Sequence, residues 1–211
     1  EERLDFSAAV LEALEPWPIR KIRFFTSIPL SGEVPGHKLA DVCGRGLKER
    51  FRQQINRLNM IFRSGFLIAV LEAEFEPVSK TYRFHFHGVA AGAYVSAIER
   101  LQKLPAYKER DHVKRPFQIN KLSSDADRAQ AISYLLKNHW KQRRIGPVGK
   151  DGVVKRQRKS QRLDEPYHSD ALLWLDRHSV SDISLFMGCR MRNSKIELTD
   201  PNSADRTSWR P

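Results

Sequence analysis

The feature that most constrains the fold is a pair of apolar segments separated by a short turn. Residues 66-FLIAVLEAEFE-76 begin with the longest apolar cluster of the chain, and 81-TYRFHFHGVA-90 follows after 77-PVSK-80. Runs rich in aliphatic and aromatic residues, bounded by turn residues, are typical of strands. The two segments therefore predict a β-hairpin.

The predicted hairpin brings together a candidate metal site. An even-numbered turn centred on PVSK pairs Glu72 with His85, and directly opposed residues of an antiparallel pair share a face. His87 projects to that same face, because alternate residues of a strand point the same way. Two imidazole nitrogens and one carboxylate oxygen suit Mg²⁺ or Mn²⁺ with open positions. A register slip of two or more residues would replace Glu72 by Glu74 or Glu76.

The rest of the chain alternates strand and helix patterns. The longest helical pattern has one apolar stripe, formed by Leu47, Phe51, Ile55, Leu58 and Phe62. The predicted elements are a helix over 6–17, a strand over 20–29, helices over 39–62 and 93–104, a strand over 116–122, and a helix capped by Ser123 or Ser124 that runs to Trp140. This order predicts an α+β domain with a central antiparallel β-sheet and flanking helices.

The composition changes after the last of these helices. The stretch 141–162 holds nine Lys or Arg and one acid, and we expect a basic loop or linker over 142–166. We expect an N-terminal helical extension over 1–19, a main domain over 20–141, a basic helical C-terminal extension over 167–198, and a disordered tail over 199–211. Residues 170–191 also faintly resemble a helix-turn-helix, although two packed helices explain the pattern more simply.

The formal net charge of +12 favours a polyanionic partner, and nucleic acid is the commonest one. A basic surface that only aids solubility is the alternative. The candidate DNA contacts are Arg20, Lys21, Arg23, Arg83, Lys141, Arg143 and Arg144.

The chain has two distant cysteines, no apolar run of membrane-spanning length and no signal-peptide pattern. We therefore expect a cytoplasmic protein, with no membrane partner.

The last predicted helix carries a candidate nucleophile. Its apolar stripe comprises Ala129, Ile132, Leu136 and Trp140. Tyr134 lies on the opposite, polar face, and Lys137 is its neighbour one turn later. A tyrosine beside a lysine is a plausible nucleophile next to a cation that positions a phosphate. An exposed tyrosine on a solvated face is the alternative.

Together, the motifs 85-HFH-87 on a strand and 134-YLLK-137 on a later helix, in a basic chain, resemble the HUH endonuclease superfamily. The order of the motifs is similar to that of the single-tyrosine replication initiators of rolling-circle plasmids and small DNA viruses. The resemblance covers roughly 20–140 and implies the HUH fold, which is RRM-like, for the main domain. The family's acidic ligand usually lies nearer the histidine pair than Glu72 does.

The resemblance implies metal-dependent nicking and joining of single-stranded DNA. His85, His87 and a divalent metal would polarise the scissile phosphate, Tyr134 would form a 5′-phosphotyrosine link, and Lys137 would position the phosphate. A double-stranded origin, a helicase acting in trans and a bacterial host would complete the system. A transposase or mobilisation enzyme with the same chemistry is one alternative. A non-catalytic, sequence-specific DNA-binding protein with structural histidines is another.

Overall fold

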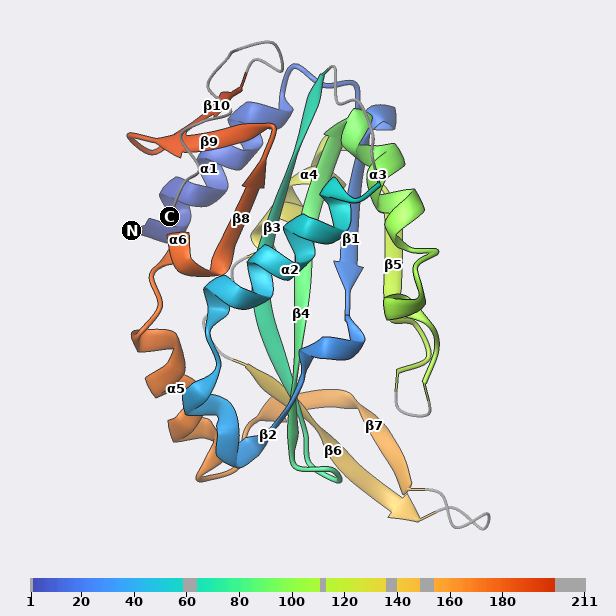
Figure 1. Ribbon diagram of the computed structural model, residues 1–211, viewed down its shortest axis with the longest axis vertical. Helices are drawn as coiled ribbons and strands as arrows, with labels where there is room; N and C mark the ends of the chain where they lie inside the picture. Colours follow the sequence, from blue (N-terminus) through green and yellow to red (C-terminus); the bar gives the residue numbers. More distant parts are fainter. Residues whose placement is uncertain (1, 59–63, 111–112, 136–139, 149–153, 200–211) are drawn as a thin grey trace.

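The computed structural model describes residues 2–58, 64–110, 113–135, 140–148 and 154–199 (Figure 1). These residues form an α+β fold with one large mixed sheet and a separate two-stranded sheet. The strand order along the large sheet is β5-β1-β4-β3-β6-β7, while β2 pairs with β4 and β8 pairs with β3.

The centre of the large sheet is the predicted hairpin. Strand β3 (Gly65–Glu76) pairs with β4 (Thr81–Gly92) over the full length of both strands, without a register shift. Glu72 lies opposite His85, as predicted. Nearly all residues of both strands are buried, because helices cover both faces.

The neighbouring strands make the sheet mixed rather than antiparallel throughout. Strand β1 (Ile22–Ser27) runs antiparallel to β4, and β5 (Phe117–Lys121) runs antiparallel to β1. Strand β6 (Lys141–Val148), however, runs parallel to β3. The central strands are antiparallel as predicted, but the parallel pairing of β6 makes the sheet mixed at this edge.

One face of the sheet packs against α2 (Gly44–Asn56) and α3 (Ala93–Leu101), which lie in front of it in Figure 1. The ring of Phe51 stacks on Phe25 of β1 and on Phe86 of β4. Gly88 makes room for this packing, because a Cβ there would lie 2.5 Å from the Phe25 ring. Residues Leu47, Phe51 and Ile55 are buried, which confirms that part of the predicted stripe.

The opposite face packs against α4 (Asp125–Ser133), which lies behind the sheet in Figure 1. Ser124 caps this helix by accepting a hydrogen bond from the Asp127 amide. Arg128 donates to the carbonyl of Leu14 at the end of α1 (Glu2–Leu14). Helix α1 is part of the same core, since Phe6, Val10 and Leu14 are fully buried.

Helix α4 is shorter than predicted. It ends at Ser133, and Tyr134 is its C-cap residue. Trp140 is outside the helix and packs edge-to-face against Tyr82 and Phe84. The chain leaves the helix because it must reach this edge of the sheet, where Lys141 begins β6. Residues 136–139 lie outside the described part.

The prediction of a basic loop over 142–166 is wrong, because two strands form in this range. Strand β6 pairs antiparallel with β7 (Val154–Arg162) to form a second hairpin, with two register shifts. It has charged residues where a buried strand would have an apolar alternation, so its sequence does not have the usual strand pattern. Backbone pairing with the exposed edge of β3 fixes its base. The remaining turn, 149–153, lies outside the described residues.

The predicted helical extension over 167–198 is only partly helical. It contains α5 (Tyr167–Asp176) and the single turn α6 (Val180–Ile183), followed by β8 (Ser184–Met187). Strand β8 pairs with residues 67–70 of β3, so the backbone groups of that buried stretch have partners on this side. No helix-turn-helix forms within the described residues 170–191.

The last described elements are β9 (Cys189–Arg192) and β10 (Lys195–Leu198), which form the small sheet. The predicted tail falls almost entirely outside the described residues. The remaining short elements are η1 (Ile19–Lys21), η2 (Leu30–Gly32), β2 (Glu33–Pro35), η3 (Gly36–Asp41) and η4 (Pro105–Tyr107). The predicted start of the second helix at 39 is thus a 3-10 turn, and residues 59–63 lie outside the described part.

Candidate metal centre

Glu72, His85 and His87 form a compact cluster, which we call the ligand triad. The Nε2 atoms of His85 and His87 are 3.1 Å apart. One carboxylate oxygen of Glu72 lies 3.8 Å from Nε2 of His85 and 3.5 Å from Nε2 of His87. All three side chains are buried.

The spacing of these atoms matches a metal ion. A triangle with these sides has a circumscribed radius of about 2.0 Å, so one point lies at metal–ligand bond length from all three atoms. Two nitrogen lone pairs that face each other at 3.1 Å repel, so the pair needs a proton or a metal ion between its members. The triad could therefore hold a divalent cation with positions left for other ligands.

The outer nitrogens of both imidazoles are fixed by partners. His85 Nδ1 donates to the backbone carbonyl of Arg83 at 3.1 Å. Because a carbonyl can only accept, the Nε2 of a neutral His85 keeps its lone pair for a metal. His87 Nδ1 lies 2.9 Å from the hydroxyl of Thr26, which can accept in the same way. Such partners orient metal-binding histidines.

The first strand was not predicted to contribute to the site. Thr26 lies directly opposite His87 in the pairing of β1 with β4. The ring of Phe24, on the same face, stacks on His87 at 6.0 Å. The sequence does show that Phe24 and Thr26 share a face, because they alternate along the strand. It does not show which strand lies beside β4.

Tyr134 lies beside the ligand triad. Its ring centroid is 6.4 Å from that of His87, with the two rings nearly perpendicular. The end of α4 presents this side chain with 53 % of its surface exposed. The predicted nucleophile and the predicted metal ligands therefore meet, although they come from segments about 50 residues apart along the chain.

The other four tyrosines are poorly placed to act as nucleophiles. Tyr82, Tyr94 and Tyr107 are buried, and burial raises the pKa of each phenol, to about 12 for Tyr94. Tyr167 is half-buried and stacks on Phe75. All five tyrosines are among the described residues, and of these only Tyr134 is exposed.

The predicted partner of Tyr134 cannot be placed, because Lys137 lies outside the described residues. Arg83, a predicted DNA contact, is buried and forms an ion pair with Glu76 at 2.9 Å. Arg83 is unsuited to contact DNA, because its side chain is buried and its charge is already paired with Glu76. Glu76 is also excluded as the third ligand, because it faces this arginine, and the observed register selects Glu72.

The remaining predicted DNA contacts lie in two groups. Arg20 and Lys21 are exposed before β1, whereas Arg23 alternates with Phe24 and so lies on the opposite face from His87. Lys141 and Arg143 are exposed on β6, and Arg143 approaches Glu74 at 3.4 Å. Arg144 belongs to β6, but its side chain is outside the described part.

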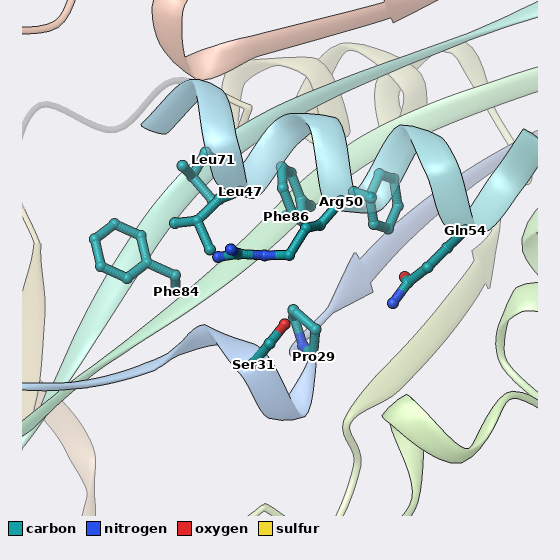
Figure 2. Close-up of a pocket in the computed structure, with 9 residues that line it drawn as sticks. Pro29, Ser31, Leu47, Arg50, Gln54, Leu71, Phe84 and Phe86 are labelled. Atoms are coloured by element: carbon teal, nitrogen blue, oxygen red, sulfur yellow. The ribbon is translucent and has the colours of Figure 1, made fainter. Parts of the chain in front are cut away.

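A small cavity lies on the other face of the sheet. Figure 2 shows Arg50 and Gln54 of α2 extending toward the segment that carries Pro29 and Ser31. Phe86 lines it, so it lies across the sheet from the ligand triad. Its volume of about 10 Å³ accommodates about one water molecule. This cavity is too small for a substrate.

No helix in the described part of the chain has the length and apolar character needed to cross a membrane. Comparison with protein-family models, with curated proteins and with solved structures found no match. The functional assignment of this chain rests on the geometry of the ligand triad and Tyr134.

Proposed function

We propose that this protein is a metal-dependent enzyme that nicks and rejoins single-stranded DNA through Tyr134. The observation that carries the proposal is the position of Tyr134, the one exposed tyrosine among the five described, beside the ligand triad. A resemblance to the HUH replication initiators in motif order supports the same reading. We propose Mg²⁺ or Mn²⁺ as the ion and initiation of rolling-circle replication as the role.

The ligand triad prepares the site for a phosphate. A divalent ion bound there would act as a Lewis acid and offset the negative charge that develops on the scissile phosphate. Glu72, His85 and His87 would hold this ion, and Tyr134 is exposed to solvent next to His87. A DNA strand that binds at the exposed phenol would bring its phosphate next to His87.

In the chemical step, Oη of Tyr134 attacks phosphorus and forms a new O–P bond. The bond from phosphorus to the 3′ oxygen of the upstream strand breaks. The phenol loses its proton and the departing 3′ oxygen gains one, so the step needs no other reactant. The phosphotyrosine link conserves the energy of the broken bond, and the reverse reaction with a 3′-hydroxyl rejoins DNA.

The first test is covalent capture of DNA. The protein is incubated with end-labelled single-stranded oligonucleotides from its own replicon, in Mn²⁺ or in EDTA, and resolved on denaturing gels. We expect a protein–DNA adduct in Mn²⁺ that is lost in EDTA and in Tyr134→Phe. Tyr167→Phe is the matched control, because it removes a half-buried hydroxyl and keeps the ring.

An adduct that persists in Tyr134→Phe would contradict the assignment of the nucleophile and leave the reaction class intact. DNA binding without an adduct in any divalent metal would contradict the enzyme proposal. It would favour a DNA-binding protein in which the histidine pair is structural.

A further inference from the structure

Helix α5 leaves apolar side chains exposed beside a groove at the margin of the molecule. Figure 1 shows this helix at the lower left of the body. Leu172 and Leu173 are adjacent in α5 and are 44 % and 56 % exposed. The groove has a volume of about 100 Å³ and lies between α5 and η3, where Leu39, Leu173 and Trp174 line it. The chemistry of the ligand triad does not use this surface.

We propose that two copies of this chain associate through α5. The two helices would pack antiparallel about a twofold axis that passes between Leu173 and Trp174, and the two Leu173 side chains would meet at the groove. Closed twofold dimers, in which each copy contributes the same surface, are the commonest oligomers. The inference does not depend on the reaction proposed for Tyr134.

Packing against the body of the molecule fixes which face of α5 is turned outward. Trp174 is buried, and its Nε1 donates to the carbonyl of Val42 at 3.0 Å. Leu173 comes three residues after Asp170 and four residues before Arg177, so these three side chains share one face of the helix. All three line the groove. The outer face of α5 therefore has an apolar centre with one charge at each end.

The two charges are arranged to complement a second copy of the helix. Asp170 lies three residues before Leu173, and Arg177 lies three residues after Trp174. A twofold axis between Leu173 and Trp174 therefore places Asp170 of each copy opposite Arg177 of the other. The two charges are about 10.5 Å apart along the helix in both copies, so both opposed pairs can form at once. Among the described residues, neither side chain has an ion-pair or hydrogen-bond partner that would have to be given up.

The charge around α5 favours a protein partner over a nucleic acid. Residues 164–182 hold five Asp or Glu and one Arg, although the whole chain has a net charge of +12. A polyanion is repelled by such a region, whereas two copies of this basic chain repel each other less here than across their basic surfaces. A different partner would need a basic residue opposite Asp170, an apolar centre and an acid opposite Arg177. Helix α5 itself supplies this pattern when it runs antiparallel.

The length of the helix limits the strength of this association. Helix α5 has 10 residues and is therefore about 15 Å long. Its contact with a second copy would bury the exposed leucines and form two ion pairs, which is a small interface for a protein dimer. We therefore expect a reversible dimer with a dissociation constant in the micromolar range.

The first test is sedimentation velocity of the whole chain over a concentration series that spans the micromolar range. We expect the wild type to change from monomer to dimer as its concentration rises. Leu173→Gln should weaken self-association by more than about tenfold, because each dimer loses two buried leucine side chains. The matched control is Leu198→Gln on β10, where the leucine is 53 % exposed, and it should leave self-association unchanged.

The second test exchanges the charges. Asp170→Lys alone and Arg177→Glu alone each place like charges opposite one another at both ends of the interface, so each variant should self-associate more than about tenfold more weakly than the wild type. An equimolar mixture of the two variants should form a heterodimer, because both opposed pairs then have opposite signs. This recovery is specific to an antiparallel pair of α5 helices.

A wild-type chain that stays monomeric throughout the series would overturn the proposal, and so would a dimer that survives Leu173→Gln. A mixture of the charge variants that stays monomeric, with both variants folded by circular dichroism, would also overturn it, because Asp170 and Arg177 would then not be opposed. The adduct assay scores the proposed function separately, since it follows a covalent product rather than self-association.

Discussion

The β3–β4 hairpin and the β6–β7 hairpin are antiparallel ribbons of the same sheet, and they differ in what surrounds them. The first pairs over its full length and is buried by helices on both faces. The second has two register shifts and exposed charged residues on both strands. Burial specifies a register, because a slip would expose apolar side chains. A charged and exposed ribbon lacks this constraint.

The difference shows which part of the molecule must hold atoms at fixed distances. Three ligand atoms must meet within a few ångströms, and two of the three ligands come from one strand of the buried hairpin. Contacts to a phosphate backbone tolerate movement, because they depend on charge more than on angle. The rigid hairpin thus suits a metal site.

The largest expected contrast is in stability. Phe86→Ala in the buried hairpin should lower the free energy of unfolding by about 3–5 kcal/mol, because it leaves a cavity beside Phe51. Ile145→Ala in the exposed hairpin should change it by about 0.5 kcal/mol or less. Urea unfolding of both variants measures this. A similar loss in the two would mean that the β6–β7 hairpin is part of the core.

Metal affinity should depend on one carboxylate of the buried hairpin, that of Glu72. Glu72→Gln should weaken Mn²⁺ binding by more than about a hundredfold, since loss of even an outer partner typically costs about 10–100-fold. Glu74→Gln, on the same face, is the matched control and should leave the affinity nearly unchanged. Isothermal titration calorimetry gives both values. A larger loss of affinity in Glu74→Gln than in Glu72→Gln would show that Glu74, and not Glu72, is the carboxylate ligand.

A smaller effect should come from the neighbouring strand. Thr26→Val keeps the shape of the side chain and removes the hydroxyl that contacts His87 Nδ1. We expect Mn²⁺ affinity to fall by about 10-fold to 100-fold. Thr81→Val, the same substitution at the start of β4, should have no effect on the affinity. If the two variants bind equally well, the hydroxyl does not orient the imidazole.

The smallest effect concerns alkaline pH and again separates the two hairpins. Burial raises the pKa of Tyr82 in the buried hairpin, and raises the pKa of Tyr94 and of Cys189 to about 12. In the unfolded chain these groups lose their protons nearer pH 8.5 to 10. The folded state therefore binds more protons in that interval, and its stability falls as the pH rises above about 9.

Urea unfolding at a series of pH values should show this decline, with a shallower slope in Tyr94→Phe. The exposed hairpin has no buried phenol or thiol of this kind, because 141–162 contains no tyrosine or cysteine. A free energy of unfolding that stays constant up to pH about 11 would contradict the shifted pKa values.

The sequence predicts the first hairpin from two apolar segments and a short turn, and an even-numbered turn gives the observed register. It thereby predicts Glu72, His85 and His87 as neighbours, and the capped start of α4 at Ser124. The β6–β7 hairpin could not be predicted, because edge pairing with β3 determines it and its own residues do not. The end of α4 depends likewise on distant packing by Trp140. The contact of Thr26 with His87 could not be predicted, because it depends on β1 lying beside β4 and the residue pattern of one strand does not give the strand order.

The attachment of β6 to β3 has a consequence for the geometry of the ligand triad. Glu74, which pairs with Lys141, lies two residues from Glu72 on one continuous strand, a separation of about 7 Å. A strand does not stretch, so the distance from the root of the β6–β7 hairpin to the metal position is constant. Bending of the exposed hairpin therefore ends at its root, and the three ligand atoms keep their spacing.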